Sequence, residues 1–168
     1  TYAEYNRKVN SLVNALKKIG IDKGDSIGIL SWNCLDYVIV YGAAMKGGYI
    51  LSRFNPRLGA EELDYLINYS EVNTLFVGPE LAEPVEKLRP RLTRVKNFIS
   101  LEGPYQNMTD LKQILASSSD EEPNIQVDED DKLHIIYTSG TTGVPRGAVY
   151  AHRQAWNEVS LVIARDSN

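Results

Sequence analysis

Residues 26–53 read SIGILSWNCLDYVIVYGAAMKGGYILSR, and this stretch decides the fold. Residues 26–30 form a short apolar run, which predicts a strand. Residues 35–46 read as a buried helix that the following pair of glycines ends, and a second short apolar run covers residues 49–53. A strand, a helix and a second strand in this order are typical of a sheet built from parallel strands.

The residues before this stretch predict an amphipathic helix. Thr1 and Glu4 have the spacing of a capping box, and Gly20 ends the helix. Between them, apolar residues repeat at helical spacing: Val9, Leu12, Val13, Leu16 and Ile19. Since the chain opens on a helix cap and not on methionine, we expect that the natural protein starts further upstream.

The residues after this stretch continue the alternation. Helices are predicted over residues 60–70, 80–89, about 109–116 and about 153–164, and strands over residues 74–77, 95–101, 133–138 and around 148–151. The predicted fold class is therefore α/β, with a mostly parallel sheet and helices on both of its faces.

Composition narrows the choice of partner. The chain has 168 residues, 43% of them apolar, which suffices for one compact domain. Its 18 basic and 22 acidic residues give a net charge of −4 and are spread along the chain. This distribution argues against a nucleic acid or an anionic membrane surface and favours a small-molecule partner. Oligomeric state is not predicted by these residues.

The rare residue types argue against a metal centre built from thiolates. Cys34 is the only cysteine and His134 and His152 are the only histidines, so neither an internal disulfide nor a multi-thiolate metal site can form. We interpret Cys34 as a buried structural thiol and both histidines as packing or helix-start residues, and we predict a cytoplasmic location. The longest apolar run, residues 37–45, is too short to span a bilayer, so no integral membrane segment is expected.

A connection without regular structure is predicted at residues 117–131, which read SSSDEEPNIQVDEDD. Small, acidic and proline residues bury little apolar area, so we expect this segment to be exposed. Its last four residues, 128–131, are all Asp or Glu. Neighbouring carboxylates in such a segment are more often solvated than bound to a metal.

A glycine-rich stretch, YTSGTTGVPRG, occupies residues 137–147 after a predicted strand. Gly140, Gly143 and Gly147 permit close approach of backbone N–H groups to an anion, the hydroxyl residues add donors, and Arg146 adds a permanent charge. These are the parts of a polyphosphate cradle. The spacing matches neither the P-loop nor the dinucleotide-binding glycine pattern. A plain surface turn is the alternative, since such residues normally collect in loops.

This stretch closely resembles the phosphate-binding signature of the AMP-forming acyl/aryl-CoA synthetases. The segments TYAEYNRKVNSLVNALKKIGIDKGDSIGIL, NCLDYV and RFNPRLGAEELDYLINYSE are similar to successive N-terminal segments of the same family, in the same order. The resemblance is strongest to the fatty-acid–CoA ligases. It implies that residues 1–168 are the N-terminal part of the adenylation domain, without the mobile C-terminal domain.

The resemblance also implies a two-step reaction. A carboxylate attacks the α-phosphate of MgATP and releases pyrophosphate, and the thiol of CoA then displaces AMP from the acyl-adenylate. ATP, Mg²⁺ and CoA are the implied cofactors and co-substrates. The residues that the resemblance places on the β- and γ-phosphates are Thr138, Ser139, Gly140, Thr141, Thr142, Gly143 and Arg146. Arg146 stands where the family usually has lysine, so the charge is kept while the donor geometry differs.

The remaining parts of the family's active site lie downstream of this stretch: the adenine-binding segment, the magnesium-binding glutamate, the ribose-binding aspartate, the acyl pocket and the lysine of the C-terminal domain. We therefore predict no catalytic and no metal-binding residue within this chain, and no activity of the chain alone. An aryl acid or an amino acid remains open as the substrate in place of a fatty acid. A stand-alone nucleotide-binding or interaction module without catalysis is the other alternative.

Overall fold

The computed structural model describes residues 1–138 and 146–157. The elements are, in order, α1 (Tyr2–Lys18), β1 (Ser26–Leu30), α2 (Leu35–Gly47), β2 (Ile50–Phe54), α3 (Ala60–Tyr69), β3 (Thr74–Val77), α4 (Pro79–Leu88), the 3₁₀ helix η1 (Arg89–Arg91), β4 (Asn97–Ser100), β5 (Thr109–Asp110), α5 (Leu111–Ser117), β6 (Lys132–Thr138) and β7 (Arg146–Ala151). Residues 152–157 are helical again. The predicted alternation of strands and helices is confirmed across the described residues.

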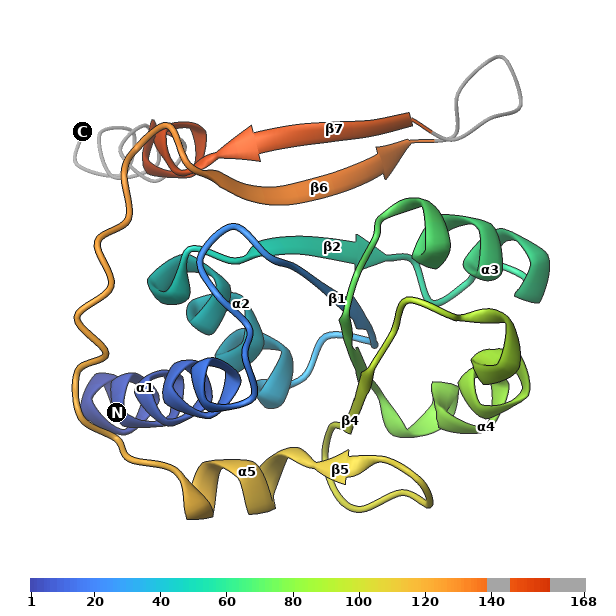
Figure 1. Ribbon diagram of the computed structural model, residues 1–168, viewed down its shortest axis with the longest axis horizontal. Coiled ribbons are helices and arrows are strands. Elements are labelled where there is room, and N and C mark those ends of the chain that lie inside the picture. The colour runs from blue at the N-terminus through green and yellow to red at the C-terminus, as the bar shows by residue number, and fades with distance from the viewer. Residues whose placement is uncertain (139–145, 158–168) are drawn as a thin grey trace, which may run out of the picture.

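The described strands form one seven-stranded sheet in the order β5-β4-β3-β1-β2-β6-β7 (Figure 1). Neighbouring strands from β5 to β6 run parallel, and β7 runs antiparallel to β6. The prediction of an α/β fold with a mostly parallel sheet is therefore confirmed. The antiparallel direction of β7 follows from the short link of residues 139–145, because a parallel crossover needs a dozen or more residues.

Helices cover both faces of the sheet, as predicted. On one face, α1, α2 and α5 bury a core that includes Leu12, Val40 and Leu111. On the other face, α3 and α4 bury a second core that includes Leu66 and Val85. Figure 1 shows α1, α2 and α5 to one side of the strands and α3 and α4 to the other. The parallel strands β1 and β3 are buried almost throughout, as expected for a sheet covered on both faces.

The first helix begins as the sequence predicts and ends slightly differently. Thr1 and Glu4 form the capping box, and the buried stripe of α1 includes Val9, Leu12, Val13 and Leu16. The prediction that Ile19 belongs to this stripe is wrong, because Ile19 is the C-cap residue and its side chain is 52% exposed. The helix has ended at that point, so the 3.6-residue periodicity no longer applies.

The structure differs from the sequence prediction in two short strands and in the burial of one side chain. The two-residue strand β5 was not predicted, because two residues carry no periodicity. The strand β7 begins at Arg146, within the stretch that we treated as a loop. Cys34, which we expected to be buried, is half-buried. Its Sγ caps α2 by accepting a hydrogen bond from the backbone N–H of Tyr37 at 3.4 Å.

A connecting segment (residues 118–131) runs from α5 to β6 without regular secondary structure. In Figure 1 it passes along the α1 and α2 side of the molecule, from the β5 edge of the sheet to β6. It is tied to α1, because Asn14 Nδ2 donates to the backbone oxygens of Ser119 and Glu121, each at 2.9 Å. Among the helices of the described residues, none is long and apolar enough to cross a membrane.

Candidate phosphate-binding site

The candidate site lies at the carboxyl edge of the sheet. The strands β1, β2 and β6 run parallel, so their carboxyl ends meet at one edge. Ligands of open α/β sheets bind at this edge, where the strands end and the loops begin. Thr138 is the last residue of β6 at this edge, and Arg146 is the first residue of β7.

The hairpin formed by β6 and β7 brings the two ends of the glycine-rich stretch together. Thr138 pairs with Arg146, and Tyr137 pairs with Gly147. Of the predicted phosphate-binding residues, the structure thus describes Thr138 and Arg146 and places their backbones side by side. Arg146 has an exposed side chain. The other five, Ser139, Gly140, Thr141, Thr142 and Gly143, lie outside the described residues.

Tyr137 anchors the hairpin to the body of the domain. Its ring stacks on Phe54 at the end of β2, with ring centroids 5.9 Å apart and planes 13° from parallel. Its hydroxyl shares a hydrogen bond with the hydroxyl of Ser70, which also donates to the backbone oxygen of Leu66 in α3. The polar contact with Ser70 at the end of α3 adds to the stacking and fixes the position of Tyr137.

Gly147 is required by close packing and not by a left-handed backbone. A Cβ at this position would lie 2.7 Å from Ile135 Cγ2 and 3.2 Å from Tyr137 Cε1, both on the neighbouring strand. The first distance is shorter than real Cβ contacts allow, so a larger residue would force β7 away from β6. The glycine therefore lets the hairpin close tightly directly beside Arg146.

Two residues at the same edge were not singled out by the sequence analysis. Trp32 follows β1 and Arg57 follows β2, and the guanidinium of Arg57 lies 5.3 Å from the centroid of the Trp32 ring. Trp32 is 43% exposed, so the pair is accessible at the surface. Their sequence signal is the position just after an apolar strand, where side chains reach the ligand edge of the sheet.

The histidines have packing roles in the described residues, as interpreted from the sequence. His134 is buried in β6 between the rings of Tyr41 and Tyr150, and its Nδ1 lies 3.5 Å from the hydroxyl of Tyr41. His152 begins the helical segment after β7, and its backbone N–H donates to the oxygen of Asp131 at 3.0 Å. Burial lowers the pKa of His152 below its ordinary value.

Mg²⁺ binds carboxylate oxygens, so the arrangement of the acidic side chains is relevant to it. In residues 1–138 and 146–157, no group of three or more His, Cys, Asp or Glu side chains is arranged to hold a metal ion. The acidic residues at the end of the connecting segment are engaged otherwise: Asp131 pairs with Lys23, and Asp130 pairs with Arg153.

The described strands and helices form an α/β domain with a mostly parallel sheet. The AMP-binding enzyme family matches residues 1–167, and the chain belongs to this family. The residue pattern at the tip of the β6–β7 hairpin is thereby part of a family-wide match and not an isolated loop motif.

Two curated relatives are ligases that act on different acids. The chain is 38% identical to 3-methylmercaptopropionyl-CoA ligase of Ruegeria lacuscaerulensis over 83% of this chain and 27% of that protein. It is 32% identical to the long-chain-fatty-acid–CoA ligase of Thermus thermophilus over 91% of this chain and 28% of that protein. The chain thus spans less than a third of the length of these relatives.

A solved structure shows the same fold. The anthranilate CoA ligase AuaEII, crystallised in complex with anthranoyl-AMP, superposes with a TM-score of 0.85 at 25% sequence identity, over 90% of this chain and 30% of that one. The described elements therefore have the arrangement found in one portion of a larger CoA ligase.

Proposed function

We propose that this chain is the N-terminal part of the adenylation domain of an ATP-dependent carboxylic acid–CoA ligase. The full protein joins the acid to AMP with release of pyrophosphate, and then transfers the acyl group to CoA. Membership of the AMP-binding enzyme family and the names of the relatives support this proposal. The observation that carries it is the hairpin that pairs Thr138 with Arg146 at the ligand edge of the sheet.

In the proposed reaction the glycine-rich stretch holds the β- and γ-phosphates of ATP. Backbone N–H groups and hydroxyls from Thr138 to Gly143 would donate hydrogen bonds to phosphate oxygens, and Arg146 would add a charge. Negative charge grows on the departing pyrophosphate, so fixed donors in this position favour bond breaking. No general base is needed, because a carboxylate nucleophile is already ionised at neutral pH.

A fatty acid is the substrate that we propose, because one curated relative is a long-chain-fatty-acid–CoA ligase and our sequence interpretation favours this branch. The other two ligases named above act on a sulfur-containing short acid and on an aromatic acid, so the experiment must cover all three classes. The full protein would be tested with MgATP, CoA and each acid, and AMP and acyl-CoA would be measured by mass spectrometry.

The expected result is acyl-CoA formation by the full protein, fastest with a fatty acid, and none by the 168-residue chain alone. Acyl-CoA formation by the isolated chain would contradict the proposal that essential parts lie elsewhere. ATP binding by the full protein without product from any acid would favour a nucleotide-binding module instead. A cytoplasmic location belongs to the same proposal and is tested by fractionating the source cells.

A further inference from the structure

The connecting segment is held to the helical layer by cations at two places. Lys46 in α2 pairs with Glu122 at 2.7 Å. Lys23, in the turn before β1, reaches three oxygens near the other end: Asp131 Oδ2 at 2.7 Å, the backbone oxygen of Gln126 at 3.0 Å and Asp128 Oδ2 at 3.5 Å. The second contact lies directly before β6, because Lys132 is the first residue of that strand.

The acidic turn (residues 128–131) joins both strands of the hairpin at their base. Within the turn, the backbone N–H of Asp128 donates to Asp131 Oδ2 at 2.7 Å, and the N–H of Asp131 donates to the oxygen of Asp128 at 3.0 Å. The backbone N–H groups of His152 and Arg153, which follow β7, donate to the oxygens of Asp131 and Glu129 at 3.0 and 2.8 Å. The turn thus connects the start of β6 with the end of β7.

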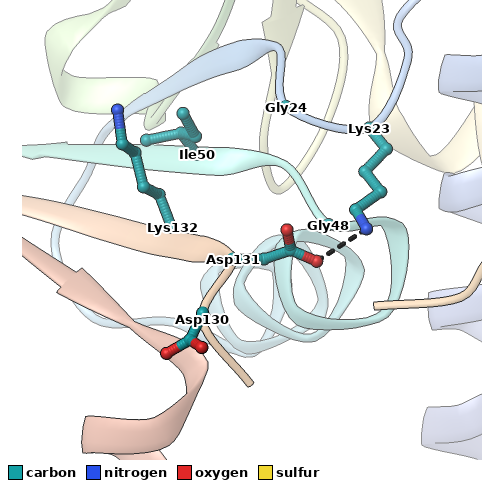
Figure 2. A pocket seen from close by; sticks show the side chains of 7 residues that line it. All are labelled: Lys23, Gly24, Gly48, Ile50, Asp130, Asp131 and Lys132. Carbon is teal, nitrogen blue, oxygen red and sulfur yellow. Dashed lines mark ion pairs between the residues drawn. The ribbon is translucent and has the colours of Figure 1, made fainter. Parts of the chain in front are cut away.

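Lys23 is the charged group that attaches this turn to the rest of the sheet. Figure 2 shows its side chain reaching toward Asp131, beside a cavity of about 330 Å³ that is also lined by Gly24, Gly48 and Lys132. Its hydrogen bond lowers the pKa of Asp131, so the carboxylate stays ionised at neutral pH. Because the pair borders an open cavity, water and salt can reach it, and its strength depends on ionic strength.

The hairpin has further attachments along β6 and near its tip, among them the contact of His134 with Tyr41 in α2. The ladder between β2 and β6 has the register pairs Leu51 with His134, Ser52 with Ile135 and Arg53 with Ile136. Tyr137 contacts Phe54 and Ser70 close to the tip. Within the described residues, β7 pairs only with β6, so the free side of the hairpin has no further strand to hold it. Among the ion pairs of the described residues, those of Lys23 join the acidic turn to the part of the domain that precedes the connecting segment.

We propose that Lys23 is a positioning residue: through Asp131 it fixes the base of the β6–β7 hairpin and thereby the placement of Thr138 and Arg146 at the tip. The part that concerns phosphate binding rests on the proposed function. The part that concerns the hairpin stands on the contacts alone. The two parts are tested by separate measurements on the same variants.

The first measurement is amide hydrogen exchange of the full protein, wild type and Lys23→Gln, followed by mass spectrometry. Exchange in residues 132–138 and 146–151 is expected to rise about three- to tenfold, whereas exchange in β3 and β4 stays unchanged. Lys23→Arg keeps the charge and is expected to restore most of the protection. Lys87→Gln is the control, since it removes a more exposed ion pair with Glu83 in α4, away from the hairpin in the chain.

The second measurement is the kinetics of the same variants with MgATP. Lys23→Gln is expected to raise the KM for MgATP about threefold or more with kcat within twofold of wild type, and Lys87→Gln to change neither. Unchanged exchange in the hairpin, or an equal rise in β3 and β4, would overturn the proposal. A local rise in exchange with an unchanged KM would overturn the positioning role. A wild-type protein without ATP-dependent activity would instead contradict the proposed function. The exchange data would still test whether Lys23 fixes the base of the hairpin.

Discussion

Thr138 and Arg146 are register partners in the β6–β7 ladder, so the two ends of the glycine-rich stretch meet at the carboxyl edge of the sheet. This relationship underlies the predictions below.

Replacing Arg146 with alanine is expected to weaken MgATP binding. If Arg146 contacts the phosphates, a charge-assisted hydrogen bond is lost, and the KM for MgATP should rise about tenfold or more. Arg146→Lys keeps the charge and matches the residue usual in the family, so its KM should stay within a few-fold of wild type. Arg94→Ala, which removes an exposed pair with Glu71, serves as the control. Equal KM values for Arg146→Ala and wild type would contradict the role.

Replacing Gly147 with valine is expected to destabilise the domain by about 1–3 kcal/mol, because the new side chain would overlap Ile135 and Tyr137. The free energy of unfolding in urea measures the effect. Ala148→Val, at the next and exposed position of β7, is the control and should change stability by less than about 0.5 kcal/mol. Similar destabilisation by both variants would contradict close packing at Gly147 as the cause.

Replacing Tyr137 with phenylalanine tests the anchor beneath the loop. The variant keeps the stacking on Phe54 and loses the hydrogen bond with Ser70, so the free energy of unfolding should fall by about 1 kcal/mol. Tyr69→Phe is the matched control at the end of α3, where the side chain is 59% exposed. Thermal unfolding of both variants measures the effect. An unchanged unfolding midpoint for Tyr137→Phe would mean that the hydrogen bond with Ser70 does not contribute to stability.

Acidification is expected to destabilise the domain in part through His152. Burial lowers the pKa of His152 in the folded state, whereas the unfolded chain titrates at about 6.5. Between these two pKa values the unfolded chain binds a proton that the folded chain does not, so stability is lost as the pH falls below about 6.5. Urea midpoints at pH 7.5 and 5.5 should differ less for His152→Gln than for wild type. An equal difference in both proteins would assign the pH dependence to other groups.

The sequence predicted the regular elements well where they are long or fully buried. The runs that became β1 and β3 were identified with their observed bounds, because a short, mostly apolar run between turn signals leaves few other interpretations. The helix α2 was identified from its apolar length and the pair of glycines that follows residue 46, and the structure places an αL cap at the second of them, Gly48. Local patterns were enough in these cases, since each element carries its own signal.

The contacts made between distant parts of the chain could not be predicted. The acidic composition of the connecting segment indicated exposure, but nothing local indicated that Lys23 and Lys46, about a hundred and about eighty residues earlier, would bind it. The close approach of Gly147 to Tyr137 likewise depends on the register of two strands. For the candidate site, the sequence indicated which residues are suited to bind phosphate. The pairing of Thr138 with Arg146 was seen only in the fold.

Acid-dependent exchange of labelled pyrophosphate into ATP by the full protein tests the central claim most directly. This reaction isolates the first step, the reversible formation of the acyl-adenylate, and needs neither CoA nor the release of acyl-CoA. We predict exchange that requires both a carboxylic acid and Mg²⁺ and that falls about tenfold or more in Arg146→Ala at limiting ATP. Exchange that is absent with fatty, sulfur-containing and aromatic acids alike, in a folded protein that binds ATP, would contradict the account.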